Sequence, residues 1–301
     1  MLRTIMDRGI TLIEYECLEN EDAERIIGFG FFAGVVGAPN GVMAYGNRTG
    51  TFKLERVYKQ RSFRELIHTY FGLKLPNLKI VVTGSGRVAH GIIEIMNLMG
   101  LYEVEPDEYL AREFSYPVFT QLKGGELYVH RQKKTYSREH FHAHSQEYKC
   151  KFLPYAFNSD ILMNGVFWDK NIPRLFEKEI IQDPKFRIQT IADISDDANG
   201  SVPINLGDQS IEDPVYGVDK KTFQKTAPYL PGSVDVMAVG NLPNELPRDA
   251  SRYFGEQLIK HVLEDLVGNG SVAIDKATIV KNGKLTDYFE YLEDYVEDDD
   301  K

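Results

Sequence analysis

Cysteine is scarce in this chain, since only Cys17 and Cys150 occur among its 301 residues. The two lie far apart in the sequence, and neither forms a CxxC motif or a Cys/His pattern with zinc-ligand spacing. The sequence therefore indicates neither a disulfide framework nor a zinc knuckle. A reducing compartment, namely the cytoplasm, is expected.

Long hydrophobic runs and an excess of basic residues are also missing. The longest nearly apolar run, residues 26–38, ends at Pro39, well short of the roughly 20 residues that span a bilayer. No membrane segment is expected, and the N-terminus shows no secretory signal pattern. Acidic residues outnumber basic ones by 45 to 35 and the net charge is -10, which argues against a nucleic-acid partner.

Strand and helix patterns alternate along the chain. Residues 78–83 form a near-continuous apolar run, which is typical of a parallel strand buried on both faces. Apolar residues then recur at helical spacing up to Gly100, and a second strand is predicted at 102–105. Further strands are predicted at 10–15, 160–166, 188–194 and 233–239, and helices within 52–71 and at 174–181 and 249–266. This alternation predicts an α/β fold with a Rossmann-type, doubly wound parallel sheet.

The turn after the 78–83 strand carries the pattern GxGxxA, with Gly84, Gly86 and Ala89 at the three small positions. The first glycine permits a tight turn, the second lets the backbone approach a pyrophosphate, and the small third residue lets helix and strand pack closely. The following helix offers free N–H groups and partial positive charge to phosphates. The sequence therefore predicts a dinucleotide site, with a Rossmann-like fold that binds no dinucleotide as the alternative.

Glu105 is the predicted ligand of the adenosine ribose. It lies 21 residues after Gly84, at the end of the second predicted strand, where a carboxylate accepts hydrogen bonds from ribose hydroxyls. Glu103 and Asp107 are close enough in sequence to take its place. A carboxylate there favours NAD because it repels a 2′-phosphate, whereas Arg87 in the turn would tolerate NADP. The expected cofactor is NAD or NADP.

Four sequence blocks carry a family resemblance: residues 24–30 with 33–34, 157–168 with 172–175, 192–197, and 240–243 with 246–250. In order and in content they resemble the L-lysine-forming saccharopine dehydrogenase and lysine–2-oxoglutarate reductase family, which is related to alanine dehydrogenase. The resemblance implies that lysine and 2-oxoglutarate condense to an imine, which hydride from a nicotinamide reduces to saccharopine. The reverse reaction uses the same chemistry, so the sequence leaves the direction open.

The resemblance also implies roles for particular residues. Ligands of open α/β sheets bind outside the carboxyl ends of the strands, and most of these residues follow predicted strands. The pyrophosphate would be held by Gly84, Ser85, Gly86, Arg87 and Val88; the dinucleotide crevice would be lined by Asn164, Gly165 and Val166; Asp193 and Asn241, Leu242 and Pro243 would lie near the nicotinamide; and Arg25 would face the substrate carboxylates. Asp193 ends a buried strand, where an unpaired carboxylate is costly, so capping is its alternative role.

Three domains are expected. Residues 1–50 are the remnant of a substrate lobe with an interlobe helix, and residues 51–245 are the NAD(P)-binding domain with an insertion near 118–151. Residues 246–301 supply a C-terminal helix that returns to the substrate lobe and an acidic tail. Family members begin with a further lobe whose Lys and His perform acid–base chemistry, and no residues here match that pair.

Catalytic residues therefore stay unassigned. Because the Lys and His pair is missing, several alternatives for the function of this chain stay open. Either the sequence is that of a truncated protein, or the missing lobe belongs to a separate chain, or the chain is a catalytically incomplete dinucleotide-binding module or partner subunit. A related amino-acid dehydrogenase with a smaller substrate is a further alternative. Self-association into a homo-oligomer is also expected, because a former lobe interface leaves apolar surface.

Two other patterns suggest structure rather than chemistry. His140, His142 and His144 form HxHxH, which on a strand would place three imidazoles on one face as zinc or copper ligands. The segment is polar and is predicted to be a loop, so no metal site is expected. Residues 123–126 are predicted to turn a hairpin between short strands, and the glycines at 28, 30, 34 and 37 are predicted to serve close helix packing.

Overall fold

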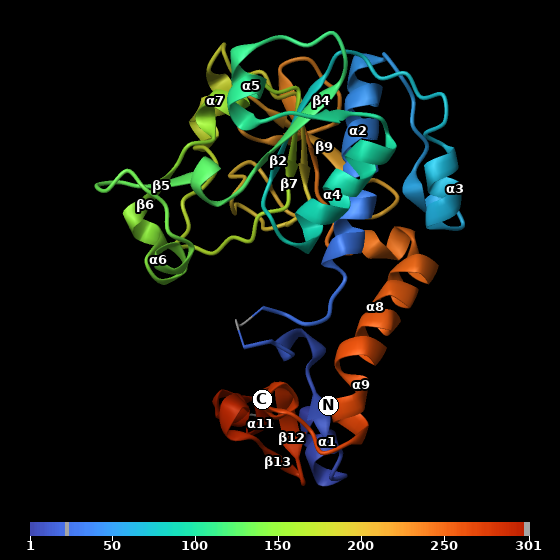
Figure 1. The fold of residues 1–301 in the computed structure, drawn as a ribbon, viewed down its shortest axis with the longest axis vertical. Helices are drawn as coiled ribbons and strands as arrows, with labels where there is room; N and C mark the ends of the chain where they lie inside the picture. Colours follow the sequence, from blue (N-terminus) through green and yellow to red (C-terminus); the bar gives the residue numbers. More distant parts are fainter. Residues whose placement is uncertain (22–23, 298–301) are drawn as a thin grey trace. The chain divides into compact units, whose positions relative to one another are not determined.

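The computed structural model of the protein describes residues 1–21 and 24–297 (Figure 1). The chain forms two compact units. Residues 30–249 form one, called here the sheet unit, and residues 1–29 with those from 250 onward form the other, called the terminal unit. The division falls after Phe29 and within helix α8 (Pro247–His261), after Asp249.

An eight-stranded sheet forms the centre of the sheet unit, with the strand order β10-β9-β11-β8-β7-β2-β4-β3. Neighbouring strands from β11 to β3 pair in parallel, and β9 and β10 extend the sheet in antiparallel fashion. The strands are β2 (Lys79–Thr83), β3 (Tyr102–Glu103), β4 (Val118–Leu122), β7 (Ile161–Asn164), β8 (Thr190–Asp193), β9 (Val215–Asp219), β10 (Lys225–Thr226) and β11 (Ser233–Met237). The predicted α/β, Rossmann-type fold is confirmed.

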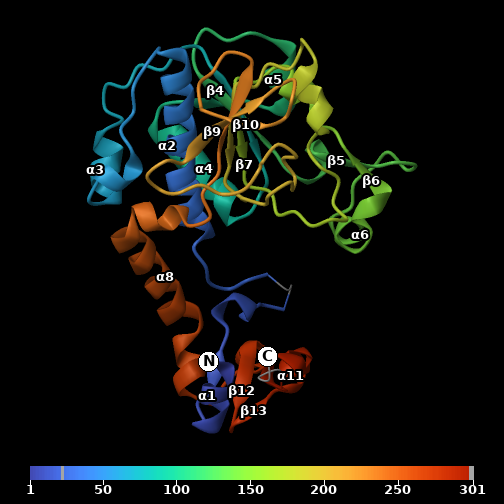
Figure 2. The ribbon, with the colours of Figure 1, turned by 180° about the vertical axis from the view of Figure 1, so that it is seen from behind.

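Helices cover the sheet on two sides. In both views α2 and α4 lie side by side on one side of the sheet, and α5 and α7 lie on the other (Figures 1 and 2). These helices and their neighbours are α2 (Gly30–Thr49), α3 (Phe63–His68), α4 (Arg87–Leu98), α5 (Pro106–Ala111), α6 (Arg138–Ala143) and α7 (Leu153–Ala156). Every residue of β2, β7 and β11 is buried, as expected of strands covered on both faces.

Helices α2 and α4 approach so closely that their backbones touch. A Cβ atom on Gly34 would lie 2.1 Å from the carbonyl oxygen of Val88, and one on Gly91 would lie 2.1 Å from that of Phe31. A Cβ on Gly37 would overlap the side chain of Ile194, which follows β8. The glycines of α2 therefore serve close packing, as the sequence predicts for residues 34 and 37.

The structure corrects the prediction for residues 118–130. Residues 118–122 form β4, a parallel strand between β2 and β3, instead of one arm of a hairpin. The turn at Gly124–Glu126 then leads to β5 (Tyr128–His130), which pairs with β6 (Tyr148–Cys150). The reason is burial, since Val118, Phe119 and Leu122 are fully enclosed in the core of the sheet unit. The excursion from the sheet therefore begins at residue 123.

Other predicted elements are shorter than the sequence suggests. The strand predicted at 10–15 is limited to β1 (Leu12–Ile13), and the helix predicted at 174–181 is instead a 3₁₀ segment, Lys178–Gln182. The helix predicted within 52–71 is confined to α3. Isolated short helices are weak in water, so tertiary packing sets these boundaries.

The terminal unit has its own small sheet and core. Strands β1, β12 (Thr278–Lys281) and β13 (Lys284–Leu285) pair antiparallel. Its other helices are α1 (Leu2–Asp7), α9 (Leu263–Val267), α10 (Val272–Ala277) and α11 (Glu293–Glu297). Its core consists of Leu18, Ile27, Val262, Ile274 and Ala277. Within the described residues of both units, no helix is long and apolar enough to cross a membrane.

Candidate dinucleotide-binding site

The glycine turn between β2 and α4 has the geometry that the sequence predicts. Gly84 has a φ of 104°, in the left-handed region, and a Cβ there would lie 2.7 Å from the carbonyl oxygen of Gly165. Gly86 precedes the first residue of α4, and a Cβ on Gly86 would meet no atom within 4 Å. Ser85 and Gly86 are exposed. The N-terminus of α4 therefore begins next to open space, an arrangement that suits the binding of phosphate groups.

A second segment lies against this turn. Gly165 follows β7, donates its N–H to the carbonyl of Thr83 at 3.1 Å, and approaches the side chain of Val88 so closely that a Cβ would overlap it at 2.8 Å. The structure therefore brings the turn at Gly84–Val88 together with Asn164–Val166. Both segments lie at the carboxyl ends of neighbouring parallel strands, where open α/β sheets bind ligands.

Asn164 ends β7 inside a buried hydrogen-bond network. Its Oδ1 accepts from the hydroxyl of Thr83 at 2.6 Å, and its Nδ2 lies 2.7 Å from Asp193 Oδ1 and 2.8 Å from the hydroxyl oxygens of Ser195 and Ser201. An amide nitrogen has two hydrogens, so these three acceptors share them. The network ties the ends of β2, β7 and β8 together and fixes the backbone that continues into Gly165.

Asp193 supports this network from the end of β8. It is fully buried, and its carboxylate accepts hydrogen bonds from Asn164, Ser195 and, through Oδ2, from Nδ2 of Asn205 at 2.9 Å. Burial raises the pKa of Asp193, while these three hydrogen bonds act in the opposite direction. Both carboxylate oxygens are engaged by the protein. Asp193 thus positions Asn164 and Asn205 in this structure, and its predicted substrate contact stays a prediction.

Asp196 is a functional candidate that the sequence interpretation missed. It is half-buried, has a φ of 56°, and among the described residues nothing hydrogen-bonds to its buried Oδ1. Burial, with the neighbouring carboxylates of Asp193, Asp208 and Asp197, raises the pKa of Asp196 to about 7. The signal was its place in a polar segment directly after a buried parallel strand. A carboxyl group that exchanges protons near neutral pH and lies at the carboxyl edge of a parallel sheet is a candidate acid or base.

Asp196→Asn should change the pH dependence of stability. The native pKa lies about 3 units above the ordinary value of 3.8, so the native state binds more protons than the unfolded state between these pH values. The contribution of Asp196 to the free energy of unfolding of the wild type therefore falls as pH rises from about 4 to 7. Allowing for partial solvent exposure, we expect a decrease of about 2 kcal/mol. The variant should lack it and be more stable at pH 8, with urea unfolding as the measurement.

The control for this pH profile is Glu179→Gln, which removes an exposed carboxylate in a 3₁₀ segment. Asparagine tolerates positive φ at least as well as aspartate, so Asp196→Asn preserves the turn. Equal stability of wild type and Asp196→Asn at both pH 4 and pH 8 would contradict the assigned pKa.

A shallow hollow lies beside Asp196 at the same edge of the sheet. It is lined by residues 208–212 with Gly240 and Asn241. A Cβ on Gly240 would lie 3.2 Å from Asp196 Oδ2 and 3.5 Å from Asp208 Oδ2. Asn241, which the sequence predicts to lie near the nicotinamide, is exposed and lines this hollow.

The neighbouring Leu242 and Pro243 have a different setting. They begin the 3₁₀ segment η6 (Leu242–Glu245), and Leu242 is buried beside Gly37 of α2. The buried Glu245 anchors η6 by accepting from Arg56 at 3.0 Å and from Asn40 at 2.7 Å. Leu242 therefore packs in the core here, whereas Asn241 is exposed and Pro243 is partly exposed.

The structure does not gather all predicted residues at this edge. Glu105 is exposed and precedes α5, and β4 lies between its strand β3 and β2. This strand order counts against Glu105 as the ribose ligand, although that role stays a prediction. Arg25 belongs to the terminal unit, where it lies 3.6 Å from Glu16 with both side chains about half exposed, and its substrate contact also stays a prediction.

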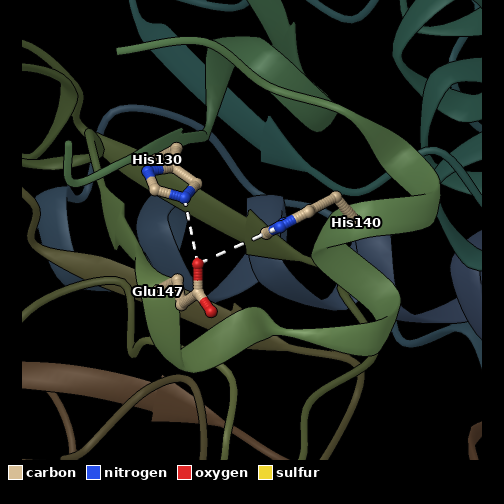
Figure 3. A group of neighbouring side chains, drawn as sticks. All are labelled: His130, His140 and Glu147. Atoms are coloured by element: carbon tan, nitrogen blue, oxygen red, sulfur yellow. Dashed lines mark hydrogen bonds and ion pairs between the residues drawn. The ribbon is translucent and has the colours of Figure 1, made fainter. Parts of the chain in front are cut away.

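Histidines of the excursion at 123–151 form a compact cluster (Figure 3). His140 and His142 lie on helix α6, so the three histidines of HxHxH do not share a strand face. His130 and His140 instead point at Glu147, with nitrogen-to-oxygen distances of 3.0 and 3.9 Å. Two ring nitrogens and a carboxylate at such distances are a possible ligand set for zinc.

Hydrogen bonds explain this cluster without a metal ion. His130 Nδ1 accepts from the backbone N–H groups of Gln132 and Lys133 at 3.1 and 3.2 Å. The ring proton of neutral His130 therefore resides on Nε2, which donates to Glu147. A metal bound at Nε2 would displace that proton and would oblige Nδ1 to carry one toward two N–H donors. His130 and Glu147 therefore form a hydrogen-bonded pair that stabilises the local structure.

Comparisons with known proteins agree with the sequence interpretation. No protein-family model matches the chain. The mitochondrial alpha-aminoadipic semialdehyde synthase of Mus musculus is 27% identical over 97% of this chain, and the NAD(+), L-lysine-forming saccharopine dehydrogenase of Candida albicans is 27% identical over 84%. The chain spans 37% of the first protein and 62% of the second. Both proteins are homologues, so the resemblance found in the sequence is confirmed.

Solved structures give the same fold. An L-alanine dehydrogenase matches over 94% of this chain and 68% of its own, with a TM-score of 0.55 and 18% sequence identity. The likeness concerns the fold alone, which is an α/β fold with a mostly parallel, Rossmann-type sheet.

Proposed function

We propose that this chain is the nicotinamide-dinucleotide-binding part of a saccharopine dehydrogenase-like oxidoreductase of lysine metabolism. The observation that carries the proposal is the glycine turn, in which Gly84 is forced against Gly165 while Gly86 leaves the N-terminus of α4 open. The homologues named above support the reaction class. The dinucleotide would accept or supply hydride, and Gly84 to Val88 would bind its pyrophosphate.

The reaction we propose is the interconversion of saccharopine with lysine and 2-oxoglutarate. Asn164 would orient the Gly165–Val166 backbone along the dinucleotide crevice, and Asp196 would hold a proton beside the hollow that contains Asn241. The side chains that perform acid–base chemistry on the substrate would come from a further lobe, in a separate chain or in additional polypeptide. A reducing location such as the cytoplasm is also proposed, since Cys17 and Cys150 are both free thiols.

Calorimetric titration of the purified chain with NADH and with NADPH tests the dinucleotide site. Saturable binding of at least one is expected. Gly86→Val should weaken binding by about 30-fold or more, because the added side chain fills the space that the pyrophosphate needs. Its melting temperature should stay near the wild-type value, since a Cβ at residue 86 meets no atom within 4 Å.

Gly255→Ala is the matched control, because a Cβ on this α8 glycine also meets nothing within 4 Å. It should bind dinucleotide as the wild type does. Folded wild-type protein that binds neither dinucleotide would refute the proposal.

Turnover separates the proposed reaction from its alternatives. Oxidation of the reduced dinucleotide should depend on lysine together with 2-oxoglutarate. Oxidation with pyruvate and ammonia instead would indicate an amino-acid dehydrogenase with a smaller substrate. Dinucleotide binding without turnover on any such pair would indicate a binding module that needs its partner lobe.

A further inference from the structure

A second hollow lies in the sheet unit, away from the glycine turn. Its volume is about 450 Å³, within the range of roughly 300–1,000 Å³ that small-molecule sites occupy. It is lined by Met43 and Asn47 of α2, by residues 53–56 with Lys59, by residues 212–215 that lead into β9, and by residues 228–229.

Helix α2 separates this second hollow from the dinucleotide site. Gly30, the first residue of α2, lies against Arg87 at the start of α4. Asn47 lies near the other end of α2, about 25 Å farther along a helix with a rise of about 1.5 Å per residue. No residue of the glycine turn lines the second hollow.

Tyr229 stands in the wall of the second hollow in a strained backbone conformation. Its φ of 67° lies in the left-handed region, which bulky side chains rarely adopt. Its backbone N–H donates to the buried Asp235 at 2.8 Å, and its hydroxyl oxygen accepts from Asn47 Nδ2 at 3.3 Å. Among the described residues nothing accepts the hydroxyl proton, so it is available to a ligand. Backbone strain of this kind gathers at ligand sites.

Charged groups of both signs line the second hollow without pairing. Lys53 and Lys59 supply ammonium groups, and Glu212 and Asp213 supply carboxylates. All four residues are exposed, and within residues 1–21 and 24–297 none of them takes part in an ion pair. Binding surfaces match the charges of their ligands, so this hollow suits a small molecule that carries a positive and a negative group.

Arg56 fixes the wall that carries the carboxylates. Its guanidinium donates to the carbonyl oxygens of Ile211 and, at 3.3 Å, of Glu212, and it pairs with the buried Glu245 at 3.0 Å. The backbone of Glu212 is thus held in place before any ligand binds. Such preorganisation lowers the entropic cost of binding.

The remaining wall of the second hollow is apolar. Met43, Leu54 and Val215 contribute aliphatic or thioether side chains, and Pro214 and Pro228 add two rings. Contact with such a wall removes the surface of an aliphatic group from water. The ligand is therefore expected to carry an aliphatic side chain besides its two charges.

We propose that the second hollow binds an α-amino acid with an aliphatic side chain. Lys53, Lys59 and the hydroxyl of Tyr229 bind its carboxylate, because charged and hydroxyl donors form strong hydrogen bonds with carboxylates. Glu212 and Asp213 bind its ammonium group. This inference goes beyond the proposed function and does not depend on it.

Equilibrium dialysis of the purified chain with radiolabelled L-leucine tests the inference. Saturable binding is expected. The competitors 4-methylpentanoate, which lacks the ammonium group, and 3-methylbutylamine, which lacks the carboxylate, should each bind at least about tenfold more weakly than L-leucine, because a charged hydrogen bond is lost.

Lys53→Ala and Asp213→Asn should each weaken L-leucine binding by about fivefold or more. Asp213 is preferred to Glu212 because Glu212 also lines the hollow beside Asp196. Lys74→Ala is the matched control, since Lys74 is exposed but does not line the second hollow. It should bind L-leucine within about twofold of the wild type. All three variants should keep the wild-type melting temperature, because each changes an exposed side chain.

Three results would overturn the inference. They are no binding of L-leucine by the folded wild type, equal binding of either one-charge analogue, and wild-type affinity for L-leucine in both Lys53→Ala and Asp213→Asn. Parallel titration with NADH and NADPH separates this inference from the proposed function. Binding of a dinucleotide without L-leucine would overturn only the amino-acid site, and binding of L-leucine without either dinucleotide would overturn only the proposed function.

Discussion

Gly91→Ala should destabilise the sheet unit severely, although it adds one methyl group to a helix. That methyl carbon would lie 2.1 Å from the carbonyl oxygen of Phe31, 2.9 Å from the backbone nitrogen of Val35 and 3.1 Å from Cα of Gly34. All three are backbone atoms of α2, so no side-chain rotation can relieve the overlap. We expect a loss of about 3 kcal/mol or more and a decrease in melting temperature of roughly 10 °C.

Gly255→Ala again provides the matched control, because it makes the same chemical change within a helix where a Cβ meets nothing. Helix propensity favours alanine over glycine by about 1 kcal/mol, so this variant should be as stable as the wild type or more stable. Thermal unfolding followed by circular dichroism measures both. If Gly91→Ala had the same melting temperature as Gly255→Ala, α2 and α4 would not be in backbone contact.

The glycine turn illustrates what sequence can predict. Strand β2, the turn at Gly84–Gly86 and helix α4 are contiguous, and each is marked by local patterns: buried apolar residues, small residues at fixed spacing, and helical periodicity. The C-terminal stop at Gly100 is equally local, and its φ of 80° confirms it. Such elements depend little on the rest of the chain.

The position of β4 shows what sequence could not predict. Residues 118–122 contain Thr120 and Gln121, and a Gly124–Gly125 pair follows, which together are typical of a hairpin arm. Whether such a segment pairs with its neighbour or enters the sheet between β2 and β3 depends on burial across the whole unit. The interpretation of Glu105 as the ribose ligand depended on that strand order.

The network around Asp193 shows the same limit at a single side chain. The sequence placed this carboxylate at the end of a buried strand, but could not tell whether it faces a ligand or the protein. Ser201 and Asn205 lie in a turn-rich segment after the strand, with no pattern that marks them as its partners. Tyr216 extends the network from β9, because its hydroxyl donates to Asn205 Oδ1 at 3.2 Å.

Asp193→Ala should therefore affect stability more than a typical surface change. It removes the acceptor of hydrogen bonds from Asn164, Ser195 and Asn205 in a fully buried site. Buried donors that lose their acceptor keep the full cost of desolvation. We expect the free energy of unfolding to fall by about 3–5 kcal/mol in urea titrations.

Asp197→Ala is the control for this loss, since Asp197 is only partly buried and follows the same strand. A change within about 1 kcal/mol is expected there. If Asp193 instead faced a ligand, its alanine variant would lose dinucleotide or substrate affinity while retaining wild-type stability. If it anchors Asn164, stability must fall first, and dinucleotide affinity should fall with it because the Gly165 backbone loses its support against Gly84. Urea titration and calorimetry together thus distinguish the two roles. A positioning residue loses stability and affinity when replaced, whereas a ligand-contacting residue loses affinity alone.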